Sequence, residues 1–570
     1  MRAVWIALFV VACHTAPRPS LVTTGEASHW ERTGRYAEAV QLCHDFARAY
    51  DGVTCREIGR TAEDRPIVAL EISRSHGPWI YVQAGIHAGE IEGKDAGFWF
   101  LRDVLDGKVA QGVLDRVNVV FVPVVSPDGH ERVSPNNRPN QRGPAEMGFR
   151  TNAERLNINR DWMKADAEET RAILGVLKQR APVVFVDLHT TDGAKFEHDI
   201  AIDAAPVAPR ADHLDEAAQT LSAAIVARMT ALGHLPVGQY YPSFAKQDDP
   251  TSGFAIGEAP PRFAHVYAGV RGSIGILVET HSWKTYAQRV QATYHFLQAL
   301  AEQALTHASE WVAAEHAAAA TPLGGTELPL VFENTKHAKT IAFRGYAYEI
   351  KPSELSTGPW ITYDESKPQV WQVPVLDEMV PKVVAKVPRA GYVIDGGFAK
   401  LARPVLDAHG ITYSVVTGQP RVAAETFRAS KVTFAPPFEG RTRVALEGGW
   451  AAETRTLDQG AIFIPIAQPL ARLIVQLLDP TGPDSLAQWG LFTTAFERKE
   501  YMESYVAEEL ARKMLAADPG LRATFDAAVA ADPELAKSSE KRLDWFYARS
   551  PAWDERFNLL PVFEVSSEPR

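Results

Sequence analysis

The chain has 570 residues, a formal net charge of -11 at pH 7, and 46% hydrophobic and 23% charged residues. This composition is typical of a globular protein, and the length predicts two or three domains. The acidic balance and the lack of a basic run argue against a nucleic-acid-binding protein. Beyond the N-terminus, no segment is long and apolar enough to span a bilayer.

The N-terminal segment predicts export. Residues 1–13, MRAVWIALFVVAC, place one arginine before a short apolar run, which is typical of a secretory signal. VVAC also resembles a bacterial lipobox, which implies a lipid on Cys13 and a lipoprotein facing the periplasm or cell envelope. The alternative is an ordinary signal and a soluble secreted protein. Residues 1–25 are therefore expected to be signal and tether.

Two further cysteines, Cys43 and Cys55, lie close together in the sequence. In an oxidising compartment they could form a disulfide, and the alternative is two unpaired buried thiols. The sequence leaves both possibilities open.

Helices and apolar strands alternate over residues 26–319, the predicted catalytic domain. In chain order we expect a helix at 35–50, two strands within 53–73, a strand at 79–85, a helix at 90–107, a strand at 117–125, a polar loop at 134–161, a helix at 167–179, a strand at 182–189, a helix at 211–232, a strand at 273–282 and a helix at 284–319. This alternation predicts an α/β fold with a mixed, largely parallel sheet covered by helices on both faces. Ligands of such sheets bind beyond the carboxyl ends of the strands.

The composition changes near residue 320, which predicts a domain boundary. Residues 320–570 are expected to form a smaller α+β or α/β accessory domain to which the sequence assigns no role. Within it, the loop at 477–490, LLDPTGPDSLAQWG, is predicted to be an interdomain packing element.

Polar side chains collect at the strand ends. His87 and Glu90 follow one apolar strand, and His189 ends another. Two histidines and a glutamate with an open fourth position form a catalytic zinc arrangement, although the histidines could merely line a pocket. Glu279 ends a third strand, either as the general base beside the metal or as a salt-bridged structural residue. His281 faces the same side of that strand, and we expect a structural role for it.

The polar loop supplies Arg150, Asn159 and Arg160. These side chains are donors suited to a carboxylate or an oxyanion. The alternative is a solvated basic loop.

Four segments in this order, HAGE, RTNAERLNINRDW, DLHTTDG and LVETHS, resemble the zinc metallocarboxypeptidases of the carboxypeptidase A type. The resemblance covers about residues 30–310 and implies a carboxypeptidase-like fold with one zinc ion per chain. The implied metal ligands are His87, Glu90 and His189, and Glu279 would activate water.

The same resemblance implies that Arg150 stabilises the oxyanion, while Asn159 and Arg160 hold a terminal carboxylate. The sequence departs from the family at Asn157, where many members have an aspartate that orients a histidine ligand. The arginine that many members carry after the first histidine is also missing.

The mobile active-site tyrosine of the family has no secure counterpart here. Tyr267 is the candidate substrate-binding residue, with Tyr240 and Tyr241 behind it.

The sequence thus predicts a zinc metallocarboxypeptidase, a hydrolase that releases C-terminal residues from peptides at the bacterial cell envelope. Its partners would be a peptide or muropeptide substrate and, through the lipid alone, a membrane. Two alternatives keep the zinc: a peptidoglycan stem-peptide hydrolase and an N-acyl amino acid deacylase. An alternative of a different class is a catalytically inactive binding lipoprotein.

Overall fold

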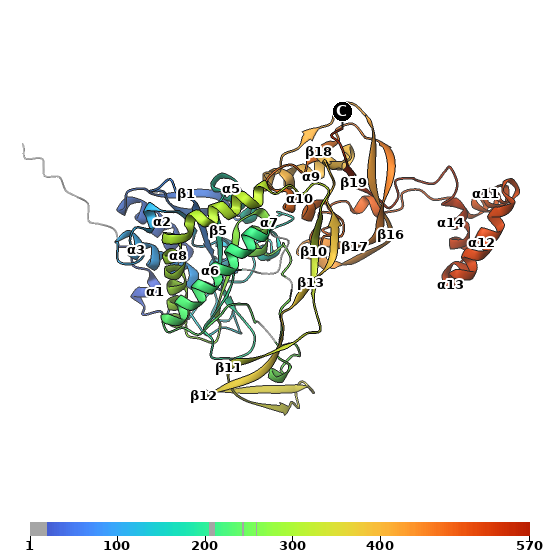
Figure 1. Cartoon of the computed structure of the whole chain (residues 1–570). Coiled ribbons are helices and arrows are strands. Elements are labelled where there is room, and N and C mark those ends of the chain that lie inside the picture. The colour runs from blue at the N-terminus through green and yellow to red at the C-terminus, as the bar shows by residue number, and fades with distance from the viewer. Residues whose placement is uncertain (1–19, 205–210, 242–243, 258, 570) are drawn as a thin grey trace, which may run out of the picture.

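The computed structural model describes residues 20–204, 211–241, 244–257 and 259–569 (Figure 1). The predicted signal and Cys13 lie outside the described residues. Among the helices within these ranges, none combines the length and apolar character needed to cross a membrane.

The first half of the described chain is built on an eight-stranded mixed sheet with the strand order β1-β2-β4-β3-β5-β9-β6-β7. The central strands β4, β3, β5 and β9 run parallel. The pairs β1–β2, β2–β4 and β9–β6 are antiparallel, and the edge strand β7 pairs parallel with β6. The strands are β1 (Val53–Arg60), β2 (Pro66–Ile72), β3 (Trp79–Ala84), β4 (Asn118–Val122), β5 (Val184–Thr191), β6 (Ile200–Asp203), β7 (Pro236–Val237) and β9 (Ile274–His281).

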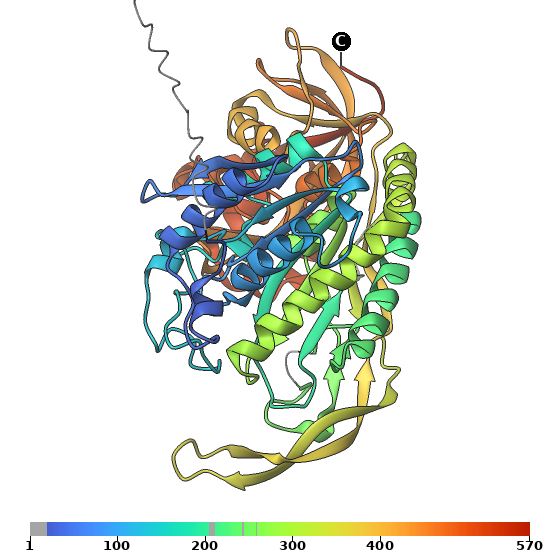
Figure 2. The same ribbon diagram turned by 90° about the vertical axis from the view of Figure 1, so that its left-hand side faces the viewer.

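Helices cover both faces of this sheet, because its central strands are apolar on both sides. One face packs against α2 (Tyr36–Ala49), α3 (Glu92–Leu105), α6 (Asp212–Ala231) and α8 (Tyr286–Ala320). Figure 2 views this side, with the long α8 in yellow-green. The other face packs against α5 (Glu168–Arg180) and α7 (Ala264–Arg271). The predicted fold class is confirmed.

The open question about the two cysteines is answered by a disulfide between Cys43 and Cys55. It links α2 to the edge strand β1. The remaining short elements of this half are α1 (Thr24–Ala27), α4 (Pro127–Glu131), β8 (Phe254–Ala255) and the 3-10 turns Val113–Asp115, Ile158–Arg160 and Pro250–Ser252.

The C-terminal half contains three parts. A six-stranded sheet comprises β14 (Gly391–Ile394), β15 (Ser414–Val415), β16 (Arg421–Phe438), β17 (Arg441–Thr456), β18 (Ile462–Pro465) and β19 (Leu559–Val565), with α9 (Gly396–His409), α10 (Ala471–Leu478) and the turn Thr493–Phe496. A long hairpin of β11 (Lys339–Pro352) and β12 (Pro359–Leu376) pairs with β8, and β10 (Glu327–Asn334) pairs with β13 (Met379–Lys386).

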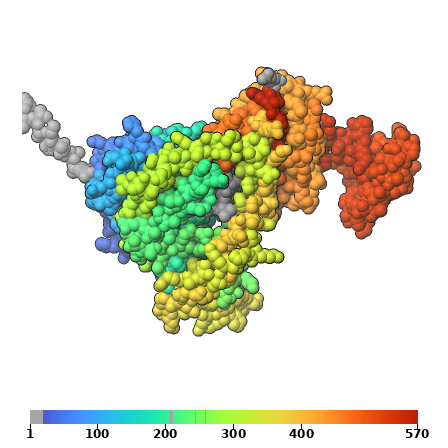
Figure 3. All heavy atoms as spheres, in the orientation of Figure 1, coloured from blue at the N-terminus to red at the C-terminus, as the bar shows by residue number. Residues whose placement is uncertain are grey.

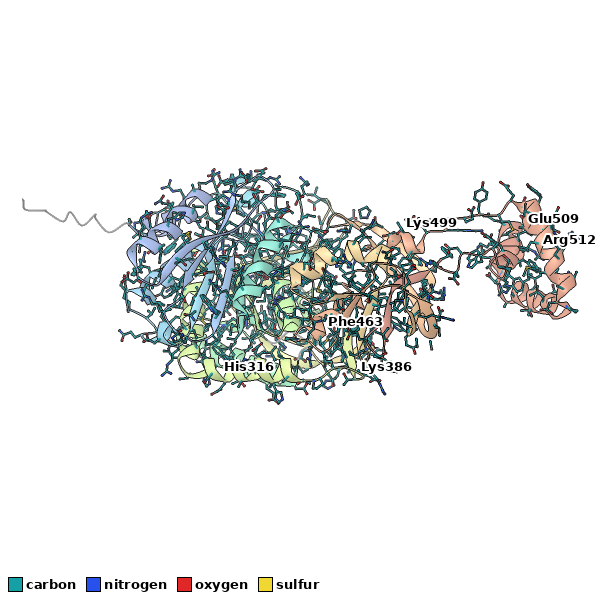
Figure 4. All side chains as sticks on the ribbon, turned by 90° about the horizontal axis from the view of Figure 1, so that it is seen from above. His316, Lys386, Phe463, Lys499, Glu509 and Arg512 are labelled. Atoms are coloured by element: carbon teal, nitrogen blue, oxygen red, sulfur yellow. A yellow bond between two sulfur atoms is a disulfide. The ribbon has the colours of Figure 1, made fainter. Side chains whose placement is uncertain are left out.

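The third part is a helical cluster of α11 (Ser504–Ala517), α12 (Pro519–Ala531), α13 (Pro533–Lys537) and α14 (Ser539–Tyr547). It projects away from the rest of the molecule in the space-filling view (Figure 3). From above, Glu509 and Arg512 of this cluster lie far from Phe463 of the six-stranded sheet (Figure 4).

The six-stranded sheet domain packs directly on the catalytic half. One hydrophobic core contains Phe185 of β5 and Tyr267 of α7 together with Leu406 of α9 and Leu473 of α10. The C-terminal domain therefore covers the second face of the main sheet.

Candidate active site

The parallel register brings the predicted site residues to one edge of the main sheet. His189 of β5 lies directly opposite Glu279 of β9. Strand β3 ends at Ala84, and Gly85 then adopts a left-handed conformation with φ 66° that turns the chain towards the site. A tight turn follows, in which the Glu90 N–H donates to the carbonyl of His87 over 2.9 Å.

His87, Glu90 and His189 are buried, and one ligand atom from each lies within 4.8 Å of the others. His87 Nδ1 is 3.1 Å from one carboxylate oxygen of Glu90, and His189 Nδ1 is 2.8 Å from the other. The predicted ligands are thus brought together.

The contacts of the Nε2 atoms of His87 and His189 determine whether their Nδ1 atoms can bind a metal ion. His87 Nε2 lies 3.0 Å from Asn157 Oδ1, and His189 Nε2 lies 2.7 Å from Asp187 Oδ2. Each Nε2 can donate its proton to this oxygen, and in the neutral ring the lone pair of Nδ1 is then available to a metal ion. Two lone pairs and a carboxylate crowded together favour a cation, and this donor set fits one zinc ion.

The ionisation of His87 agrees with this assignment. Burial lowers the pKa of His87 to about 4, so its ring stays neutral at physiological pH. A neutral imidazole is the form that binds a metal.

Glu279, the predicted general base, is buried beside His189. It is 8% exposed, and its Oε2 atom has no hydrogen-bond partner among the described residues. Burial, followed by the nearby carboxylates, raises the pKa of Glu279 well above its usual range, against the attraction of His189. No ion pair of this side chain occurs in the described part of the chain, which argues against the salt-bridged alternative.

The metal ligands and Glu279 line a cavity of about 370 Å³ together with Arg150, Asn159 and Arg160. The guanidinium of Arg160 lies 4.0 Å from the centre of the Phe263 ring and donates to the Asn159 carbonyl over 2.7 Å. Burial, followed by Arg150 and then Arg262, lowers the pKa of Arg160 to about 10. The cavity therefore has one strongly cationic wall.

Two side chains at the site were missed by sequence reasoning. Arg138 Nη2 lies 2.7 Å from Glu90 Oε1, and Arg138 also lines the cavity. A Cβ atom at Gly89 would lie 2.7 Å from Arg138 Cγ, so this glycine leaves room for the arginine. No sequence pattern in the polar loop indicates that Arg138 lies at the site. Asp187 could have been predicted there, since it lies two residues before His189 on the same strand face.

The prediction that Tyr267 binds the substrate was wrong. This side chain is fully buried in the core on α7, and its hydroxyl lies 2.7 Å from His409 Nδ1. Tyr240, one of the two alternatives, lines the cavity, and its hydroxyl accepts a hydrogen bond from Thr191 over 2.9 Å. The tyrosine at the site therefore comes from the segment before β8.

His281 lies beside the cavity with its ring stacked on Phe196 at a centroid distance of 3.9 Å. Its Nε2 atom accepts a hydrogen bond from the backbone N–H of Phe196. This packing agrees with the structural role expected for His281.

Comparison with known proteins agrees with this geometry. Residues 39–296 match the family described as zinc carboxypeptidase, so this part of the chain is similar to that family. A stretch of 110 residues is 32% identical to mouse carboxypeptidase A4 and covers 18% of this chain and 26% of that protein. The matched stretch thus spans about a quarter of that relative.

Several solved structures show a slight likeness. The metallo-carboxypeptidase from Pseudomonas aeruginosa matches with a TM-score of 0.36 and 19% identity over 48% of this chain and 68% of that chain. The carboxypeptidase A from Helicoverpa armigera matches with a TM-score of 0.36 and 14% identity over 51% and 75%.

Proposed function

We propose that this protein is a zinc-dependent peptidase that releases C-terminal residues from peptides. The observation that carries the proposal is the meeting of three features in one cavity. These are the His-Glu-His ligand set, the buried carboxylate of Glu279 without a hydrogen-bond partner at Oε2, and a wall of arginines. A purely structural metal site would need neither a free base nor an open cavity.

When bound, zinc supplies Lewis-acid chemistry, which stabilises negative charge on oxygen and makes water more acidic. In the proposed reaction Glu279 takes a proton from the attacking water, whose oxygen adds to the scissile carbonyl carbon. Arg150 stabilises the negative charge that develops on the carbonyl oxygen. Glu279 then delivers the proton to the leaving nitrogen as the C–N bond breaks, which yields a carboxylate and an amine.

Asn159 and Arg160 are proposed to hold the C-terminal carboxylate of the substrate. The Arg160 guanidinium packs on the Phe263 ring and donates to the Asn159 carbonyl. These contacts preorganise it to bind a carboxylate. This preference for a free carboxylate would restrict cleavage to the last peptide bond.

We further propose that the protein is exported and works at the cell envelope, held by a lipid on Cys13. The disulfide between Cys43 and Cys55 supports this location, because such bonds persist in oxidising compartments. The substrate would then be a peptide or a stem peptide of the cell wall.

Hydrolysis of a small substrate panel tests the proposal. The panel contains blocked dipeptides with free C-termini, their amidated twins, a muropeptide stem and N-acyl amino acids, each with and without a chelator. We expect chelator-sensitive cleavage of the free-carboxylate peptides alone. Glu279→Gln is expected to keep the bound zinc and to lose about 10²–10⁴ in kcat, the usual contribution of a general base.

Each of the other outcomes would support a different function. Cleavage of the muropeptide alone would identify a cell-wall hydrolase, and cleavage of the N-acyl amino acids alone a deacylase. Stoichiometric zinc without any cleavage would refute the peptidase proposal and favour a binding lipoprotein.

A further inference from the structure

Three consecutive residues support the cationic wall of the cavity. The Phe263 ring lies beneath the Arg160 guanidinium, and the Ala264 N–H donates to Asn159 Oδ1 over 2.9 Å. The residue before them, Arg262, lies 5.7 Å from the centre of the Phe263 ring and forms an ion pair with a residue of the C-terminal domain. The position of this short segment therefore sets the positions of Asn159 and Arg160.

Arg262 is held by the C-terminal domain. Asp484, which is completely buried, accepts hydrogen bonds from the Arg262 backbone N–H over 3.1 Å and from its Nη1 atom over 2.9 Å. Arg443 lies 3.6 Å from the same carboxylate. Asp484 belongs to the loop at 477–490 that the sequence marked as a packing element, and this loop reaches the wall of the cavity.

We propose that Asp484 is a positioning residue for the substrate carboxylate, acting through Arg262 and Phe263 on Arg160. The proposal rests on the peptidase function above and assigns the C-terminal domain a part in substrate binding. A buried carboxylate bonded to both the backbone and the guanidinium of one residue fixes that residue in place. Without Asp484, Arg262 and Phe263 are no longer held in place, and Arg160 loses the ring that orients it.

The charge distribution supports this role. Burial, followed by the nearby charges of Arg150 and Arg262, lowers the pKa of Arg160, whereas Glu439 and Asp484 act in the opposite direction. The C-terminal domain thus supplies negative charge that offsets the crowding of three guanidinium groups.

A second contact reaches the metal ligands from the same domain. The carboxylate of Glu439, in the turn between β16 and β17, accepts a hydrogen bond from the Asn157 backbone N–H over 2.8 Å. Asn157 in turn contacts His87. The domain therefore fixes both ends of the segment that carries Asn157 and Arg160.

The test compares zinc-loaded wild type with Asp484→Asn in the full chain. We measure kcat and KM for a blocked dipeptide, and by calorimetry the Kd of N-acetylphenylalanine, a product that retains the carboxylate. KM and Kd are expected to rise about 10- to 100-fold, as for loss of a supporting contact, with a smaller change in kcat and unchanged zinc binding. Phe263→Leu, which keeps the ion pair, is expected to change KM in the same direction. Asp166→Asn is the control, since it removes an ion pair to Arg441 across the same domain contact without touching the cavity wall.

The outcomes separate this inference from the proposed function. If Asp484→Asn lowers the thermal midpoint but leaves KM and the product Kd unchanged, Asp484 is only structural and the inference is wrong. If wild type binds the product without hydrolysing any peptide, the proposed function fails while the Kd comparison still tests Asp484. If Asp484→Asn does not fold, unchanged KM and Kd in Phe263→Leu overturn the inference. If wild type neither binds nor hydrolyses, both proposals are overturned.

Discussion

Replacing Asn157 by Asp should tighten zinc binding. The Asn157 Oδ1 atom accepts the His87 Nε2–H over 3.0 Å and also the Asn159 backbone N–H over 3.1 Å. An aspartate oxygen can keep both contacts and adds a negative charge behind the ligand. A hydrogen bond to a charged group contributes about 1.5–3 kcal/mol against about 1 kcal/mol for a neutral one. A gain of about 1 kcal/mol corresponds to about a fivefold lower Kd for zinc.

The assay is competition for zinc between the metal-free protein and a chromophoric chelator at pH 7.5. Asn157→Leu has a similar size but no acceptor, and its zinc Kd should rise about 10- to 100-fold. If Asn157→Asp leaves the Kd unchanged or weakens binding while the fold is intact, the acceptor behind His87 does not control the ligand, and the reasoning is refuted.

Three further predictions concern stability and the metal. Burial, followed by two neighbouring carboxylates, raises the pKa of Glu564 from 4.5 to about 8, so its contribution to the free energy of unfolding is complete below pH 4.5 and is lost as pH rises through 8. Urea unfolding at pH 5 and 9 should show a loss on the order of a few kcal/mol in wild type that Glu564→Gln largely removes. Replacing Cys43 and Cys55 by Ala should lower the unfolding free energy by about 3 kcal/mol in the same assay, and an unchanged midpoint would contradict this. Arg138→Met should raise the zinc Kd about tenfold, because Glu90 loses its orienting partner, whereas a lower Kd would mean that the guanidinium competes with the metal.

That His87, His189 and Glu279 lie close together could be predicted from the sequence because strand ends have a simple geometry. His189 and Glu279 each end an apolar strand, and the carboxyl ends of neighbouring parallel strands meet at one edge of the sheet. His87 lies at the same edge because Gly85 ends its strand in a turn. The class of the fold, a largely parallel sheet covered on both faces, followed from the alternation of strands and helices.

Other residues could not be placed from periodicity. Tyr267 was the candidate for the active-site tyrosine that the family resemblance implies, but the helix α7 directs it towards His409, more than a hundred residues away. Arg138 lies in a loop without any repeating pattern, so only the folded chain brings it to Glu90. Which side of a helix meets a distant domain is decided by packing that a single sequence does not display.

The predicted boundary near residue 320 coincides with the end of a helix, but it does not separate two hydrophobic cores. The helix α8 ends at Ala320, yet Phe185 in the main sheet and Leu473 in α10 belong to one continuous hydrophobic cluster. The same domain contact includes the hydrogen bonds from Arg262 to Asp484, on which the proposed positioning role of Asp484 rests. By contrast, the helical cluster α11–α14 has its own small core and contributes no residue to the described lining of the cavity. The hydrophobic core of the main sheet therefore continues into the six-stranded domain, whereas the described helices α11–α14 form a separate small core.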